Sequence, residues 1–195
     1  MQKEVYIMSK NVASKIGNGI SPEQFIAGMT KNKEQFISWK EQFQWPSEDD
    51  KAFYESLNNR DDLRCLIVMA DWCGDAVRNI PVVFNVLENS GIPIDVLIME
   101  DHLDTIDQFL TYGGRSIPIV IIADTGGAVL GQWGPRPKHV QEVMAQFKAT
   151  NPDREAADYA ERMAVVREGI LAQYGEGTGY QAHIVTELRE VLESV

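Results

Sequence analysis

Short apolar runs that alternate with amphipathic segments form the main pattern of this chain. Residues 66–70 and 94–99 are apolar runs short enough to be strands buried on both faces. Between them, apolar residues recur at the spacing of one helix face, at Val77, Ile80, Phe84 and Leu87. A strand, a helix and a second strand in this order predict two parallel neighbours joined by a right-handed crossover.

The second half of the predicted sheet follows a more polar segment. Residues 117–123 indicate a third strand and residues 128–133 its antiparallel partner, because Gly126-Gly127 between them fits a hairpin turn. A helix is expected over 100–110, before the third strand, and another over 138–148, after the fourth. The whole pattern predicts a mixed sheet of four or five strands, with the third strand antiparallel to a central strand at 66–70.

The N-terminal part of the chain indicates three helices. Ser21-Pro22 marks the first helix start, Thr30 is expected to cap the second, and 47–50 resembles a capping box that opens the third. Aromatic residues gather here, at Phe36, Trp39, Phe43, Trp45, Phe53 and Tyr54. They form either a docking face for a partner or a helical layer packed on the sheet, and we favour the packed layer.

The C-terminal part is again helical. After Asn151-Pro152-Asp153, which we interpret as a boundary, helices are expected over 154–174 and 180–192. The predicted organisation is a helical N-terminal extension over 1–59, an α/β domain over 60–149 and a helical C-terminal extension over 150–195.

Composition narrows the range of partners. The 195 residues, 44% of them hydrophobic, suit one globular domain with additions or two small domains. A net charge of −11 argues against nucleic acid or an anionic membrane as a partner, since both would be repelled. The pattern predicts neither a signal peptide nor a membrane span. The two cysteines make no disulfide framework, so we expect a cytoplasmic protein with reduced thiols.

Cys73 stands where the first predicted strand ends and a helix begins. The first turn of a helix presents unpaired N–H groups and the positive end of the helix dipole, which stabilise a thiolate. Asp71 and Asp75 act against this effect as nearby anions. We expect the effect of the N–H groups to outweigh that of the carboxylates, so that the pKa of Cys73 is modestly lowered. We also expect this thiol to be partly exposed. Cys65, at the other end of the strand, is too distant to form a disulfide with it.

The sequence Trp72-Cys73-Gly74-Asp75-Ala76 resembles the thioredoxin active-site motif Trp-Cys-Gly-Pro-Cys, with alanine in place of the last cysteine. Pro81 matches the proline of the thioredoxin active-site helix, and Ile117-Pro118 matches the cis-proline loop that faces the thiol. Gly126-Gly127 and Gly134 also fall at family-like positions. The resemblance covers residues 60–148 and implies a thioredoxin-like fold, a mixed four- to five-stranded sheet flanked by helices, with helices added at both ends. The longer pattern is similar to bacterial thioredoxin-like proteins with a helical N-terminal extension.

The same resemblance implies a site and a reaction. Cys73 is the implied catalytic residue, and the implied substrate groove is formed by Trp72, Gly74, Asp75, Ala76, Ile117 and Pro118. Because position 76 is alanine, one molecule alone cannot resolve a mixed disulfide. What remains is monothiol exchange, in which a small thiol or another protein releases the bound partner. The implied partners are protein or small-molecule disulfides and thiols, with no cofactor. Ile67 departs from the family, which keeps a buried aspartate there to assist proton transfer.

Two functions of different classes stay open. In the first, Cys73 is a working monothiol, and the chain resembles a thiol–disulfide oxidoreductase with a single active-site cysteine. In the second, the fold has lost redox activity and serves as a binding module, with the added helices as its contact surface. The retained Trp72-Cys73-Gly74, the cis-proline loop and the helix proline favour the first.

Other polar residues are expected to have no role in the chemistry. Arg136 could reach an anion such as the carboxylate of a small thiol, but we expect an ordinary surface arginine. His102, His139 and His183 are widely separated in the sequence, and none has a second ligand at metal-like spacing. We therefore expect them to lie singly, as structural or surface residues, with no metal site.

Overall fold

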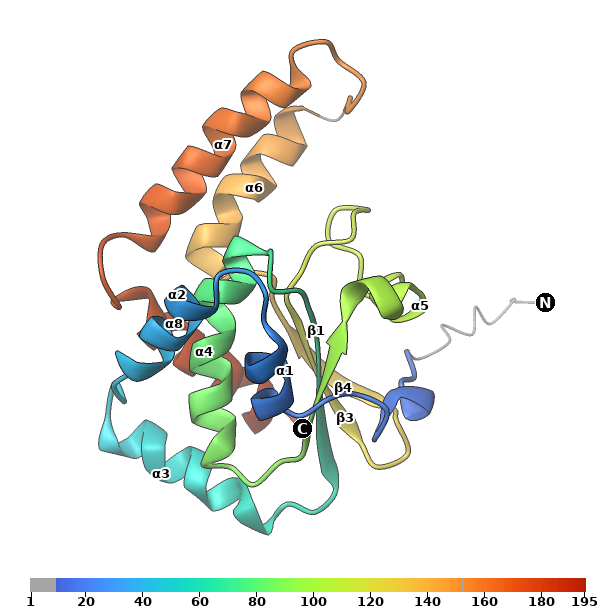
Figure 1. Cartoon of the computed structure of the whole chain (residues 1–195), viewed down its shortest axis with the longest axis vertical. Helices are drawn as coiled ribbons and strands as arrows, with labels where there is room; N and C mark the ends of the chain where they lie inside the picture. Colours follow the sequence, from blue (N-terminus) through green and yellow to red (C-terminus); the bar gives the residue numbers. More distant parts are fainter. Residues whose placement is uncertain (1–9, 152) are drawn as a thin grey trace, which may run out of the picture.

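A four-stranded mixed sheet forms the centre of the protein (Figure 1), with strand order β2-β1-β3-β4. The computed structural model describes residues 10–151 and 153–195; residues 1–9 of the predicted N-terminal extension and Pro152 at the predicted boundary lie outside the described residues. The strands are β1 (Leu63–Met69), β2 (Ile94–Ile98), β3 (Ile119–Asp124) and β4 (Val129–Trp133). β1 pairs parallel with β2 and antiparallel with β3, which confirms the predicted sheet and its central strand.

The strand directions place the end of β1 beside the start of β3. Ile67 in β1 lies opposite Val96 in β2 and Val120 in β3, and Val68 lies opposite Ile119. β1 is almost completely buried, as expected for an apolar strand that is covered on both faces. Because β1 and β3 are antiparallel, the chain leaving β1 meets the loop that enters β3.

Helices cover both faces of the sheet. α4 (Gly74–Glu88) packs against α2 (Lys33–Glu41) and α8 (Tyr180–Glu193), and α8 also contacts β4. α4 and α8 lie on one side of the sheet and α5 (Leu103–Ile106) on the other (Figure 1). The helix predicted over 100–110 is shorter than expected, because only α5 and the 3₁₀ turn η3 (Met99–Asp101) form in this segment.

The N-terminal helices begin close to their predicted positions. After the 3₁₀ turn η1 (Ala13–Lys15), α1 (Pro22–Gly28) opens with a capping box in which Ser21 and Gln24 bond each other's backbone. Asn32 directly precedes α2, and Thr30 does not cap it, because the hydroxyl of Thr30 bonds Asp71 instead. Ser47 caps α3 (Glu48–Ser56), as predicted, and the 3₁₀ turn η2 (Leu57–Asn59) follows it.

The aromatic residues of these helices form a packed layer. Phe36 and Tyr54 are fully buried. The ring of Phe36 lies 5.8 Å from that of Phe84 in α4, and the ring of Trp45 lies 5.6 Å from that of Tyr54, both measured between centroids. These contacts confirm the packed helical layer and leave little of the aromatic surface for a partner.

Three helices follow the sheet: α6 (Lys138–Thr150), α7 (Tyr159–Tyr174) and α8. α7 begins at Tyr159, five residues later than the start predicted at 154. α6 and α7 form an antiparallel pair that projects from the body of the molecule, and α8 then returns to the core (Figure 1). Among the residues that the structure describes, none of the helices is both long and apolar enough to cross a membrane.

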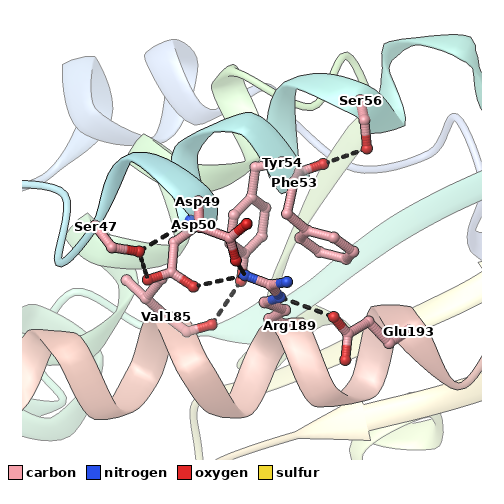
Figure 2. A network of polar contacts seen from close by, with 9 residues as sticks. All are labelled: Ser47, Asp49, Asp50, Phe53, Tyr54, Ser56, Val185, Arg189 and Glu193. Atoms are coloured by element: carbon pink, nitrogen blue, oxygen red, sulfur yellow. Dashed lines mark hydrogen bonds and ion pairs between the residues drawn. The ribbon is translucent and has the colours of Figure 1, made fainter.

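The N-terminal and C-terminal helices meet at a polar junction between α3 and α8 (Figure 2). Arg189 donates to Asp49 at 2.6 Å and to Asp50 at 3.1 Å, and it also pairs with Glu193 on its own helix. The hydroxyl of the fully buried Tyr54 donates to the carbonyl oxygen of Val185 at 2.8 Å. The two predicted extensions are therefore packed on each other as well as on the sheet.

Candidate functional site

Cys73 lies between the end of β1 and the first turn of α4. It is the residue directly before α4, and its backbone is extended. Its thiol donates to the carbonyl oxygen of Ile117, with a Sγ–O distance of 3.4 Å. The Ile117–Pro118 peptide bond is cis. The predicted cis bond, and the predicted approach of its loop to Cys73, are both confirmed.

The environment of the thiol differs from the sequence-based expectation. Cys73 is buried, with 8% of its surface exposed, so the prediction of a partly exposed thiol is wrong. Burial raises the pKa of Cys73, and the Asp75 carboxylate adds to this effect. The backbone N–H groups of Ala76 and Asp75, and the charge of Arg136, act in the opposite direction. The net pKa is raised, not lowered, because the loss of hydration beneath the 117–118 loop outweighs the contribution of the helix start.

Asp71 takes no part in this balance. Its Oδ2 accepts hydrogen bonds from the backbone N–H of Thr30 at 2.8 Å and of Lys31 at 3.0 Å. Partial burial acts to raise the pKa of Asp71, but these hydrogen bonds outweigh it and lower the pKa. The predicted repulsion between Asp71 and the thiol is therefore wrong, because this carboxylate is used to fix the segment before α2.

Asp75 is paired with Arg136. Arg136 Nη2 lies 2.6 Å from Asp75 Oδ2, Arg136 Nε donates to Oδ1 at 2.9 Å, and the two side chains are only 13% and 16% exposed. Arg136 also donates to Gln141. The expectation that Arg136 is an ordinary surface residue is thus wrong, because its guanidinium balances the charge of the carboxylate next to Cys73.

The C-terminal helices contribute directly to this site. The hydroxyl of Tyr174, the last residue of α7, donates to Asp75 Oδ1 at 3.0 Å. The buried Asn79 of α4 donates to the Tyr174 oxygen at 2.8 Å and to the carbonyl oxygen of Pro135 at 3.1 Å. Sequence analysis missed Tyr174 and Asn79, since no local pattern marks them. Arg136 lies between two prolines, in Pro135-Arg136-Pro137, which is a local signal of a fixed backbone at this position.

The predicted groove residues have three different surroundings: the thiol itself and two cavities. The Ile117 carbonyl accepts from the thiol, the backbone N–H of Ala76 bonds it, and Ala76 and Pro118 are both buried. Trp72 is 47% exposed, and its indole N–H donates to Glu100 at 2.7 Å. It lines a largely apolar cavity of about 460 Å³. Gly74 and Asp75 line a second cavity, of about 380 Å³.

Other candidate residues are placed away from the thiol. Cys65 is fully buried in β1, burial raises its pKa, and both cysteines are free thiols. Ile67 is also fully buried in β1, so no carboxylate occupies the position of the family's buried aspartate.

Two histidines that are distant in the sequence are neighbours in the fold. The rings of His139 in α6 and His183 in α8 are 4.3 Å apart between centroids, so the prediction that the histidines lie singly is wrong for this pair. Within the described ranges 10–151 and 153–195, no three His, Cys, Asp or Glu residues are grouped so that they could hold a metal ion.

Comparisons with known proteins agree with this fold. The family model described as thioredoxin matches residues 19–148, which include α1–α3 as well as the sheet. A protein of unknown function from Pseudomonas aeruginosa has a similar structure, with a TM-score of 0.53 and 17% identity over 95% of this chain and 93% of that chain. An HIV epitope-scaffold is also similar, with a TM-score of 0.52 and 18% identity over 96% of this chain and 94% of that chain. At such identities the likeness shows the fold alone, and the comparison with curated proteins found no match. Because the family model covers well over half of its residues, the chain belongs to the thioredoxin family.

Proposed function

We propose that this protein carries out monothiol thiol–disulfide exchange through Cys73. The observation that carries the proposal is the contact between Cys73 Sγ and the Ile117 carbonyl, at 3.4 Å, beside the cis Pro118. This contact places the sulfur beside the 117–118 loop, and we propose that an extended substrate pairs with the backbone of this loop. The N–H groups of Asp75 and Ala76 are directed at the same sulfur and stabilise its thiolate.

The exchange consists of two displacements. The Cys73 thiolate attacks one sulfur of a disulfide, the S–S bond breaks, and the departing thiolate takes a proton from solvent. Cys73 then remains in a mixed disulfide. Ala76 has no sulfur to resolve it, and Cys65 is buried in β1. A second thiolate, from a small thiol or another protein, therefore attacks the partner's sulfur and releases the thiolate of Cys73.

The raised pKa of Cys73 affects both how fast the thiol attacks and how long the mixed disulfide lasts. Only a minor fraction of the thiol is ionised at neutral pH, although a thiolate of higher pKa is more nucleophilic. Such a thiolate is also a poor leaving group, so the mixed disulfide is long-lived. These properties favour a protein that holds its partner until a thiol releases it. The proposal includes a reducing compartment such as the cytoplasm, which supplies that thiol.

Turnover of a neutral small disulfide tests the proposal. The reduced protein is mixed with bis(2-hydroxyethyl) disulfide and a free thiol, and disulfide reduction is followed together with the mass of the protein. We expect the wild-type chain and Cys65→Ser to form a single adduct and to turn over, while Cys73→Ser does neither. Ala76→Cys supplies a resolving thiol and should add reductase activity on protein disulfides.

One result would reverse the choice between the two functions. If Cys73 formed no adduct under conditions in which the unfolded chain is readily modified, the monothiol function would fail. The binding-module alternative would then take its place.

A further inference from the structure

The cavity beside Gly74 and Asp75 has a chemical character of its own. Arg78, Arg136 and Arg167 line it, together with the single carboxylate of Asp75. It lies between the start of α4 and the last turns of α7, and Ile170 and Leu171 supply an apolar wall. Three arginines in one cavity of about 380 Å³ contrast with the net charge of −11 of the whole chain. We call this cavity the arginine pocket, after Arg78, Arg136 and Arg167.

The bonding of the arginines distinguishes this pocket from the rest of the molecule. Most arginines of the chain donate a hydrogen bond to another residue: Arg60, Arg64, Arg115, Arg136, Arg154, Arg162 and Arg189. Arg78 and Arg167 have no hydrogen-bond or ion-pair partner among residues 10–151 and 153–195, and both line the arginine pocket. The unpaired guanidinium groups of the described chain therefore gather in one pocket, which Gly74 and Asp75 also line.

The guanidinium of Arg78 is positioned by aromatic rings but has no carboxylate partner. Its guanidinium lies over the rings of Trp39 and Tyr174, with Cζ 5.0 and 5.1 Å from the ring centroids. Its Nη1 atom is buried and has no hydrogen-bond partner. Arg78 also lines the arginine pocket, so a ligand there would meet a guanidinium that no carboxylate of the described chain neutralises.

We propose that the arginine pocket binds the carboxylate of a small disulfide or thiol that exchanges with Cys73. The inference rests on the proposed function and adds to it the substrate class. Arg136 is already engaged by Asp75, so Arg78 and Arg167 supply the free donors, whose planar forks match a carboxylate. Ile170 and Leu171 contact the carbon chain of the ligand. Gly74 and Asp75, which follow Cys73 directly in the chain, also line this pocket.

The exchange then follows the steps given above, with a carboxylate-bearing thiol as the product. Cys73 attacks the nearer sulfur, and the distant half of the disulfide departs as a thiolate and is protonated by solvent. The half that stays bonded to Cys73 keeps its carboxylate in the arginine pocket until a second thiol releases it.

The net negative charge of the protein and the arginine pocket predict opposite preferences, so an experiment can distinguish them. A chain of net charge −11 repels anions and attracts cations over distances up to a Debye length, about 8 Å at physiological ionic strength. Without a specific site, a cationic disulfide would therefore react fastest with Cys73. A preference for an anionic disulfide points to local recognition.

Three aliphatic disulfides of similar length test the inference: 3,3′-dithiodipropionate, which ends in carboxylates, neutral bis(2-hydroxyethyl) disulfide, and cystamine, which ends in ammonium groups. The rate constant for adduct formation at Cys73 is measured by mass spectrometry on the full chain. We expect the carboxylate compound to react about tenfold faster than the neutral one, and cystamine to be slowest. Arg167→Gln and Arg78→Gln should bring the carboxylate-to-neutral ratio towards one. Arg115→Gln, an exposed arginine paired with Asp107, is the matched control and should keep the ratio.

Arg167→Gln is the decisive variant, because Arg167 is exposed and its loss leaves the core unchanged. If the neutral compound reacts and the carboxylate compound is no faster, the arginine pocket is overturned while the proposed function stands. A carboxylate preference that survives both Arg78→Gln and Arg167→Gln overturns it as well. If no disulfide modifies Cys73, the inference falls together with the proposed function.

Discussion

At the scale of single residues, the chemistry of Cys73 is governed by the groups that touch its sulfur. The carbonyl of Ile117 accepts from the thiol, and two N–H groups at the start of α4 favour the thiolate. Burial opposes ionisation more strongly than these N–H groups support it, so the pKa of Cys73 is raised. Of the two nearby carboxylates, Asp75 contributes to the raised pKa of Cys73 and Asp71 does not.

The raised pKa predicts a steep pH dependence of alkylation. The thiolate is the reactive species, and its fraction rises about tenfold per pH unit as long as the pH stays below the pKa. We therefore expect the rate of Cys73 alkylation by iodoacetamide in the native protein to keep rising past about pH 9, where the rate for an ordinary thiol of pKa about 8.5 levels off. A rate that reached its plateau below pH 8 would show a lowered pKa and contradict this account.

Two aspartate variants separate the contributions of the neighbouring carboxylates. Asp75→Asn removes the anion that raises the pKa of Cys73 and leaves the positive charge of Arg136 nearby, so alkylation at pH 7 should be about threefold faster or more. Asp71→Asn is the matched control and should leave the rate unchanged, because Asp71 binds the backbone of Thr30 and Lys31. Equal acceleration in both variants would disprove this assignment.

Sequence analysis predicted the thiol and its loop but not the residues that balance the charge around them. Cys73 and Pro118 belong to motifs at fixed spacing, and the strand order brings them together. Tyr174 reaches Asp75 from 99 residues away, through a helix whose path no local pattern specifies. For the same reason, nothing in the sequence showed that Asp71 and Asp75 are bonded by residues from opposite ends of the chain.

At the scale of elements, α6 and α8 meet through two imidazole rings. Burial, together with the neighbouring His183, lowers the pKa of His139. Glu187 of α8 acts in the opposite direction but does not reverse the shift. The folded state therefore binds fewer protons than the unfolded state at this residue, and protonation disfavours the contact between the helices.

This shift predicts a loss of stability in mild acid. The contribution of His139 is fully present above its unfolded pKa of about 6.5 and is lost as the pH falls towards the lower folded value. Urea unfolding at pH 7, 6 and 5 measures this effect. His139→Gln should reduce the decrease in the free energy of unfolding between pH 7 and 5. An identical decrease in the variant would contradict the prediction.

The element that the sequence predicted least well is α5. Apolar spacing at Ile106, Phe109 and Leu110 predicted a helix to 110, but the backbone of Gln108 and Phe109 bonds three residues back, as in a 3₁₀ turn. Tyr112 and Gly113 then adopt positive φ, which reverses the chain. Phe109 is still buried, so the apolar pattern correctly marked burial while the local backbone followed the turn.

At the scale of the whole molecule, the last helix, α8, is part of the core. Ile184 and Leu188 of α8 are fully buried. Glu187 accepts hydrogen bonds from the indole N–H of Trp133 in β4 and from the backbone of Lys138, both at 2.8 Å. The sequence predicted helical extensions at both ends, and in the structure α3 and α8 also contact each other. Contacts of this kind join segments far apart in the chain, so amphipathic spacing alone does not reveal them.

Two leucines of the C-terminal helices test this integration. Leu188→Ala leaves a cavity beneath α8 and should lower the free energy of unfolding by about 2–5 kcal/mol. Leu171 in α7 is 57% exposed, and Leu171→Ala should change it by no more than about 0.5 kcal/mol. Chemical denaturation of both variants gives the comparison. Similar small effects would mean that α8 is a loosely attached addition.

The central claim is that Cys73 is a working monothiol, and the most direct test is its reaction with bis(2-hydroxyethyl) disulfide in the native protein. Intact mass spectrometry reports the number of adducts, and peptide mapping reports their position. The account predicts one adduct per chain, at Cys73, that persists until an added thiol removes it. A folded protein that gains no adduct, while the same chain in urea is modified at both cysteines, would contradict the claim.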